Sequence, residues 1–348
     1  KRNGCNRLLI VDLIPEKDNT QNMDTSKLFP NVVGQSKVKR KLAFYAKNYK
    51  ANSRIPHLFF SAPKGAGKTH VATAMSRLLA SRENEGKAKV LRTVNCSEFK
   101  GLSKFVNEFL IPKVVDQEVT VFFDECHMMP KQIANALLTI LNPNKDRRTQ
   151  YSYEDFDMDF DFTRQSFMMA TTEYDKVFEP LKSRFTEITL QEYSLEELGK
   201  IVSYNLDGYD FEDGVLEDIA SVTRGNARTA TTLADDIKDN LDMLGTTKLT
   251  NDIWDYFKYA HNLNPLGLFE REIGVLNVLN ENHPTPVSVS FVCANVGDTL
   301  GTVQNYEKML MKNGLMEREN NCQRLITAKG REYLTNLEEI TQKNKAYA

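Results

Sequence analysis

The sequence predicts an α/β protein in which a parallel sheet is followed by two smaller domains. Three features support this fold class. Short apolar runs typical of buried strands, at residues 58–61, 119–123 and 166–170, alternate with helix-like segments. Apolar residues then recur at helical spacing from Ser194 to about residue 261. Finally, the order of elements after residue 264 is that of a winged helix: helices at about 268–279, near 292 and from 299, then short strands at 315–318 and 324–327.

The composition is that of a globular protein with several domains. The 348 residues exceed what one hydrophobic core usually serves, and 41% hydrophobic and 26% charged residues are ordinary proportions. No apolar run reaches about 18 residues, so we expect no membrane span. The five cysteines are scattered without a Cys-x-x-Cys pair, which favours reduced thiols and a cytoplasmic location. Because the net charge is −2, any DNA contact must come from a local patch.

Changes in pattern divide the chain into segments. The first is polar and without periodicity, and the dipeptide Pro265-Leu266 lies in a stretch that reads as a linker. We expect an N-terminal extension (1–27), a large α/β domain (28–192) with an insert at about 143–164, a helical domain (193–263), a winged helix (264–336) and a tail (337–348).

A glycine-rich loop lies between the strand at 58–61 and a helix expected at 68–79. It reads Ala62-Pro63-Lys64-Gly65-Ala66-Gly67-Lys68-Thr69 and matches the P-loop pattern Gly-x-x-x-x-Gly-Lys-Ser/Thr except at its first glycine. In such a loop the backbone N–H groups surround the phosphates of ATP, Lys68 neutralises their charge and the Thr69 hydroxyl binds Mg²⁺. The helix N-terminus also attracts anions. Since the later glycines make the close approach to phosphate, we expect a working loop despite Ala62.

Two carboxylates end the second apolar strand. Asp124 and Glu125 directly follow Val119–Phe123, which is the Walker B arrangement. Asp124 is expected to bind Mg²⁺, and Glu125 to polarise the water that attacks the phosphate. His127 is expected to be a local structural residue.

Further motifs follow in a specific order. They are Val33-Gly34-Gln35 before the P-loop, Asp124-Glu125-Cys126-His127, Ala170-Thr171-Thr172, Pro180-Leu181-Lys182-Ser183-Arg184-Phe185 and Arg224-Gly225-Asn226-Ala227-Arg228. From about Leu28 to about Leu334, this succession resembles the RuvB family, the hexameric AAA+ motors of Holliday-junction branch migration. Walker motifs alone are shared by many ATPases, whereas the two arginine motifs with a winged helix after them are far more specific.

The resemblance implies an AAA+ P-loop NTPase core, a helical lid domain and a C-terminal winged helix, assembled as a homo-hexameric ring on duplex or junction DNA. It implies that Thr172 senses the γ-phosphate, that Arg184 is an arginine finger reaching the neighbouring subunit's nucleotide, and that Arg228 contacts ATP in cis. Each residue places a donor or cation where charge grows as the γ-phosphoryl group leaves. Val33, with Val32, is expected beside the adenine.

The insert at 143–164 alternates in character. Aspartates at odd positions from 155 to 161 alternate with Phe156, Met158, Phe160 and Phe162, which predicts a strand with one acidic and one apolar face. A calcium loop is excluded, because Phe160 and Ser166 stand where Gly and Glu are required. The resemblance implies a β-hairpin that docks on a RuvA-like partner protein through residues such as Phe156 and Phe160. A hairpin packed on its own domain is the alternative.

Four basic residues of the winged helix are candidates for DNA contact. Lys308 and Lys312 lie on the long helix, and Arg318 and Arg324 flank the turn of the wing. Neutralising phosphates with such side chains gives affinity that is independent of sequence and sensitive to salt, as a translocating motor requires.

Two other functions compete with a DNA motor. A clamp-loader-like switch is disfavoured because Phe185 stands where clamp loaders typically carry Cys, and because clamp loaders end in a helical collar. An ATPase that remodels protein partners remains open, because the net charge is negative and the insert is acidic.

Overall fold

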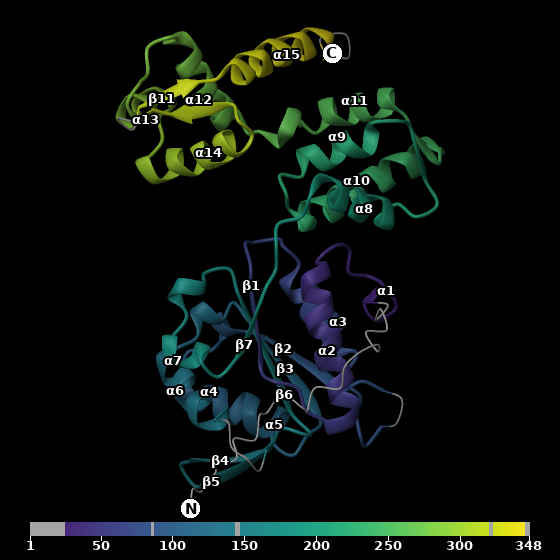
Figure 1. The fold of residues 1–348 in the computed structure, drawn as a ribbon, viewed down its shortest axis with the longest axis vertical. Coiled ribbons are helices and arrows are strands. Elements are labelled where there is room, and N and C mark those ends of the chain that lie inside the picture. The colour runs from purple at the N-terminus through teal and green to yellow at the C-terminus, as the bar shows by residue number, and fades with distance from the viewer. Residues whose placement is uncertain (1–24, 85–86, 143–146, 320–322, 345–348) are drawn as a thin grey trace, which may run out of the picture. The chain divides into compact units, whose positions relative to one another are not determined.

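A computed structural model describes residues 25–84, 87–142, 147–319 and 323–344 (Figure 1). The expected N-terminal extension lies outside these residues except for its end, which begins helix α1 (Thr25–Leu28). The chain forms two compact units. The first comprises Lys1–Ala62 and Lys68–Leu190, and the second comprises Pro63–Gly67 and Gln191–Ala348.

A five-stranded sheet forms the centre of the first unit, in the order β2-β3-β6-β1-β7, and every neighbouring pair is parallel. The strands are β1 (Leu58–Ser61), β2 (Val90–Asn95), β3 (Val119–Asp124), β6 (Ser166–Thr171) and β7 (Thr186–Thr189). Strands β1 and β6 are buried along their whole length, as expected for strands covered on both faces. The three strands predicted from apolar runs are confirmed.

Helices cover both faces of this sheet. Helices α2 (Ser36–Asn52) and α3 (Lys68–Ser76) share one core cluster, in which Leu42 and Met75 are fully buried. The opposite cluster is built by α4 (Leu102–Phe105), the π-helix Val106–Leu110, α5 (Ile111–Lys113) and α6 (Lys131–Ile140). Helix α3 ends three residues earlier than predicted, because the N–H groups of Leu78 and Leu79 turn back to carbonyls only three residues before them.

The insert forms an antiparallel hairpin of β4 (Arg148–Tyr153) and β5 (Phe156–Asp161). Met158 and Phe160 are buried in the core of their own unit, whereas Phe156 is 50% exposed. The apolar face of the strand therefore packs mainly on its own domain. The expectation that Phe160 docks on a partner is wrong, because its ring is fully buried, and Phe156 alone stays available.

The second unit begins with four helices: α8 (Leu195–Asn205), α9 (Val215–Val222), α10 (Ala227–Leu244) and α11 (Asn251–Ala260). Short parallel strands β8 (Asp210–Phe211) and β9 (Lys248–Leu249) pair between them. Ser194 and Glu197 form a capping box at the start of α8. Asn226 caps α10 by accepting from the N–H groups of Arg228 and Thr229.

A winged helix follows. It contains α12 (Glu270–Glu281), α13 (Val289–Val296), α14 (Leu300–Lys312), β10 (Met316–Arg318) and β11 (Arg324–Ile326), which confirms the predicted order. The segment around Val287 pairs with Arg324 as an isolated bridge. The chain then forms α15 (Ala328–Asn344), which continues from the winged helix into the segment expected as a tail.

The helical domain and the winged helix are joined by a buried ion pair. Arg224 donates to both carboxylate oxygens of Glu272, at 2.8 and 2.7 Å, and to the carbonyl of Gly267. Glu272 is 1% exposed, and the Arg224 guanidinium also lies over the Phe269 ring. Because a buried carboxylate without its partner is strongly unfavourable, this contact ties α12 to the chain just before α10.

Across the residues that Figure 1 draws as ribbon, no helix is both long and apolar enough to span a bilayer.

Candidate active site

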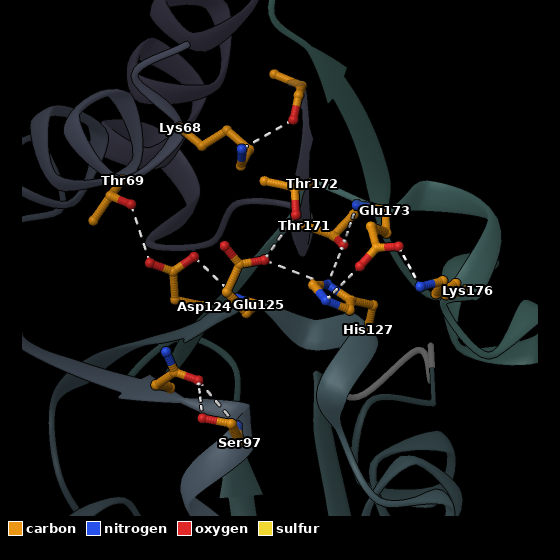
Figure 2. Close-up of polar contacts among 12 residues, drawn as sticks. Lys68, Thr69, Ser97, Asp124, Glu125, His127, Thr171, Thr172, Glu173 and Lys176 are labelled. Atoms are coloured by element: carbon orange, nitrogen blue, oxygen red, sulfur yellow. Dashed lines mark hydrogen bonds and ion pairs between the residues drawn. The ribbon is translucent and has the colours of Figure 1, made fainter. Parts of the chain in front are cut away.

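Polar side chains gather at one edge of the sheet in the first unit. Strands β1, β3 and β6 are neighbours and parallel, so the residues that follow them meet at the same edge. Ala62, Asp124 and Thr172 are the first residues at or after these strand ends. Figure 2 shows the network that they form with the start of α3.

The glycine-rich loop has the backbone that phosphate binding requires. Gly65 and Gly67 have φ values of +79° and +84°, a region that residues with a Cβ rarely adopt. Lys68 begins α3 and is 6% exposed, and its ammonium donates to the carbonyl of Ala62 at 2.9 Å. A buried cation at a helix N-terminus favours an anionic ligand at this position.

Two oxygen ligands meet beside the loop. The Thr69 hydroxyl donates to Oδ2 of Asp124 at 3.1 Å, and Oδ1 of Asp124 accepts from the N–H of Glu125. A hydroxyl and a carboxylate suit a hard cation such as Mg²⁺, which usually takes its other ligands from phosphates and water. Within the described ranges, no cluster of three or more His, Cys, Asp or Glu able to hold a metal occurs.

Glu125 is held in a specific orientation. Its backbone is left-handed, with φ +49° and ψ +49°, which costs a non-glycine residue free energy and is typical of functional sites. One of its carboxylate oxygens accepts from the Thr172 hydroxyl at 3.1 Å and lies 3.3 Å from Nδ1 of His127. Glu125 and Thr172, which the sequence suggested separately, are thus in direct contact (Figure 2).

His127 contributes more than the sequence predicted. Its side chain is 8% exposed, Nδ1 lies 2.9 Å from the Thr171 hydroxyl, and Nε2 lies 3.2 Å from Glu173. The hydrogen bond from Lys176 to Glu173 holds the pKa of that carboxyl below its usual value, and His127 contributes to the same shift. His127 therefore connects Glu125 to Thr171 at the end of β6. In the sequence, only the Asp-Glu-x-His motif pointed to His127.

Arg184 lies after α7 (Glu179–Lys182) and is not part of the network in Figure 2. Its backbone is fixed on both sides, because its N–H donates to Leu181 and the following Phe185 ring packs on the buried ring of His57. Its Nε is buried and, within the described part of the chain, has no hydrogen-bond partner. Arg184 thus has a fixed backbone and an unsatisfied donor.

Arg228 and Val33 occupy different surroundings. Arg228 is exposed on the first turn of α10, and its N–H donates to the carbonyl of Gly65 at 3.3 Å as well as to Asn226. Gly65 belongs to the same unit as Arg228. In the first unit, Val32 is buried in the core and Val33 is half-buried just before the left-handed pair Gly34-Gln35.

The four candidate DNA contacts of the winged helix differ from one another. Lys308 and Lys312 are exposed on α14, although Lys312 pairs with Glu192 at 2.6 Å. Arg324 is only 5% exposed and forms two hydrogen bonds with the fully buried Glu307, which Arg318 also contacts. Burial opposes ionisation of Glu307, but the bonds from Arg324 and Arg318 outweigh it and lower its pKa. The structure argues against Arg324 as a DNA contact, because its guanidinium is used inside the domain.

Comparisons with known proteins agree with this geometry. Residues 58–193 match the AAA family, described as "ATPase family associated with various cellular activities", and residues 265–335 match the RuvB C-terminal winged helix domain. The Holliday junction branch migration complex subunit RuvB of Sulfurimonas denitrificans is 26% identical over 317 residues, covering 86% of this chain and 85% of that protein. The corresponding Campylobacter curvus subunit is 25% identical, with coverages of 87% and 86%.

A solved structure has the same fold. The RuvB Holliday junction branch migration motor of Thermotoga maritima superposes with a TM-score of 0.65 at 23% identity, covering 88% of this chain and 98% of that one. The phosphate loop, the Asp124-Glu125 pair and the sheet order define a nucleotide-binding P-loop ATPase domain of the AAA+ class. With an AAA domain followed by a RuvB-type winged helix, and with RuvB subunits similar to it along most of its length, the chain is a RuvB-like AAA+ protein.

Proposed function

We propose that this protein is an ATP-driven ring motor that translocates DNA and drives branch migration of Holliday junctions or related DNA remodelling. One observation carries the proposal: the same chain holds a phosphate loop, a hydrogen-bonded Glu125–Thr172 pair and a RuvB-type winged helix. The names of the relatives, which are subunits of a Holliday junction branch migration complex, support the choice of substrate.

The first group of residues binds and hydrolyses ATP. Lys68 neutralises the β- and γ-phosphates, and Glu125 orients the attacking water and accepts its proton. Thr172 orients Glu125 through the hydrogen bond described above and contacts the γ-phosphate. The remaining nucleotide contacts are proposed for the backbone of Val33, Pro63, Lys64, Gly65, Ala66 and Gly67.

Thr69 and Asp124 are the proposed Mg²⁺ ligands, since both present oxygens at one point beside Lys68. A bound Mg²⁺ would neutralise phosphate charge. Thr69 and Asp124 hold the ion, Glu125 orients the water, and Lys68 stabilises the phosphate charge.

Two arginines complete the site. We assign Arg184 to the nucleotide of the neighbouring subunit, where its unsatisfied Nε would find an acceptor. Arg228 is assigned to ATP of its own chain, because it is exposed on the first turn of α10 and belongs to the second arginine motif. Since one site then needs residues of two chains, activity depends on assembly, and a hexameric ring is the proposed form.

DNA contact is assigned to Lys308, Lys312 and Arg318 of the winged helix, without Arg324. Residues 264–336 hold seven Lys or Arg against eight Asp or Glu, so only a local cluster can attract phosphates. A partner resembling RuvA is proposed to dock on the hairpin tip, where Phe156 is exposed beside aspartates.

The experiment that tests DNA translocation compares DNA binding and strand exchange. Fluorescently labelled duplex and four-way junctions are titrated with protein at about 0.05 and 0.2 M salt, where phosphate-dominated affinities differ by orders of magnitude. Branch migration is then followed with ATP. We expect salt-sensitive binding and ATP-dependent migration, both absent for a Lys308→Ala/Lys312→Ala/Arg318→Ala variant that still hydrolyses ATP. Absence of DNA binding at low salt would instead favour remodelling of protein substrates.

A further inference from the structure

Helix α2 of the first unit carries an exposed basic face. Between Ser36 and Arg54 the chain has seven Lys or Arg and no Asp or Glu. Residues of α2 that share helical spacing and point away from the core are Lys37, Arg40, Lys41, Phe44 and Lys47. We call these five residues the α2 face. Phe44 at its centre is 56% exposed.

The cations of the α2 face lack acidic partners. Lys41 donates to a backbone carbonyl, that of Glu187, while Lys37, Arg40 and Lys47 form no ion pair with any described residue. A cationic stripe around an exposed aromatic ring, with no carboxylate paired to it among the described residues, is typical of a surface that binds an anionic partner.

Helix α10 of the second unit carries the opposite charge. The helical domain at 193–263 has fourteen Asp or Glu against six Lys or Arg. Asp235, Asp236 and Asp239 are exposed at helical spacing, and the stripe ends in Met243, which is 75% exposed. We call these four residues the α10 face. Asp235 and Asp236 form no ion pair with any described residue.

We propose that the α10 face of one copy docks on the α2 face of a neighbouring copy. This inference rests on the proposed ring, and it identifies the surfaces that hold the ring together. The two helices have 17 and 18 residues, so the stripes are of similar length. The α2 face follows the spacing i, i+3, i+4, i+7 from Lys37. The α10 face follows i, i+3, i+7 from Asp236, with Asp235 four residues before Asp239, and each face includes one exposed apolar side chain.

Charge complementarity selects a second copy over DNA as the occupant of the α2 face. The acidic α10 face is complementary to a basic surface. DNA bound to the α2 face would neutralise the cations of α2 but leave the carboxylates of α10 without a counter-charge. In addition, the α2 face carries four cations and the α10 face three carboxylates, so the two charges nearly balance when the faces meet. Complementary charges of this kind select partners and orient them more than they raise affinity.

The test is a charge swap in the full-length protein. Arg40→Glu with Lys47→Glu reverses the α2 face, and Asp236→Lys with Asp239→Lys reverses the α10 face. Assembly is measured by sedimentation velocity with nucleotide at about 0.1 M salt, where screening acts over about 10 Å. We expect each double variant to assemble at least about tenfold more weakly, and the quadruple variant to recover most of this loss, because the reversed charges again attract.

A matched control is Lys100→Glu with Lys113→Glu, two exposed lysines of the same unit outside the α2 face, which changes the net charge equally. Circular dichroism verifies folding, so that loss of assembly is not loss of structure. Recovery in the quadruple variant is the decisive result, since a merely structural effect would accumulate instead.

Three outcomes would overturn the inference. The α2 variant could assemble like the control, or the quadruple variant could be as weak as either double variant. Alternatively, the α2 variant could assemble normally and lose duplex binding in an anisotropy titration, which would make the α2 face a nucleic-acid site. Each leaves the proposed function standing if the wild type assembles and its ATP turnover still requires Arg184. A wild type that stays monomeric with ATP contradicts both.

Discussion

Glu125 owes its position to three local features. Its backbone is left-handed directly after β3, the Thr172 hydroxyl donates to its carboxylate, and His127 lies beside the same oxygen. A carboxylate held in this way can orient a water molecule without first losing side-chain freedom.

Replacing Thr172 by Val removes that hydrogen bond and keeps the side-chain shape. We expect kcat for ATP hydrolysis to fall about 10- to 100-fold, since a slight misplacement of a catalytic group costs up to about 100-fold. The affinity for a fluorescent nucleotide should stay within about twofold, because ground-state binding depends mainly on the phosphate loop. Thr172→Ser, which keeps the hydroxyl, is the control. Wild-type turnover by Thr172→Val would refute this role.

His57 makes stability depend on pH. Burial, with a smaller contribution from nearby Arg54, lowers its pKa to about 3, whereas an unfolded histidine titrates near pH 6.5. Between these values the unfolded chain binds a proton that the folded chain does not. The free energy of unfolding therefore falls as the pH drops from about 6.5 towards 3, and His57 has no such effect above about 6.5.

In His57→Phe, which suits the surrounding rings of Phe162, Phe167 and Phe185, this component disappears. Urea unfolding of both proteins between pH 7.5 and 4.5 should show a difference in stability that changes in favour of the variant below about pH 6.5. Parallel pH profiles would mean that His57 takes up its proton in the folded state.

At the scale of elements, the strands with continuous apolar runs were predictable and the edge strands were not. Strand β1 (Leu-Phe-Phe-Ser) is buried on both faces, so its sequence alone predicts it. Strands β2 and β7 lie at the two edges, and β7 reads Thr-Glu-Ile-Thr with a single buried residue. Their sequences carry little apolar pattern. These two strands therefore depend on pairing with β3 and β1, which a local sequence pattern does not reveal.

For the candidate site, local motifs were readable and contacts between distant residues were not. Lys68, Thr69 and Asp124 could be assigned because their spacing is fixed by a strand and a turn. Whether Arg324 is free depends on Glu307, which lies 17 residues before it on another element. Likewise, alternation in the insert predicted two faces, but not that Phe160 packs against its own domain while Phe156 remains exposed.

The hairpin gives a matched pair of variants. Phe160→Ser should lower the free energy of unfolding by about 3–5 kcal/mol, since a fully buried ring is removed. Phe156→Ser should change it by less than about 0.5 kcal/mol, because that ring is half exposed. Denaturant unfolding of the two variants measures the difference. Equal losses would place Phe156 in the core as well.

At the scale of the whole molecule, catalysis and assembly are proposed to be one property. Glu125 and Thr172 are hydrogen-bonded to each other near Lys68 (Figure 2), whereas Arg184 has a donor that is unsatisfied among the described residues. The arrangement is explained if the next subunit supplies the arginine that each site lacks. Hydrolysis then reports on ring contacts, and each subunit can act only after its neighbour is in place.

Mixed rings of two inactive variants measure this directly. Arg184→Ala keeps its own Glu125, and Glu125→Gln keeps its arginine, so each lacks what the other can donate. We expect an oligomer of either variant alone to hydrolyse ATP at below about 1% of the wild-type rate. The control variant Arg77→Ala, which changes an exposed residue, should stay fully active. Co-assembled in equal amounts, they should recover about a quarter of wild-type turnover, since that fraction of interfaces pairs an intact site with an intact arginine. A mixture as inactive as its parents, or an Arg184→Ala oligomer with ordinary turnover, would contradict a site shared between subunits.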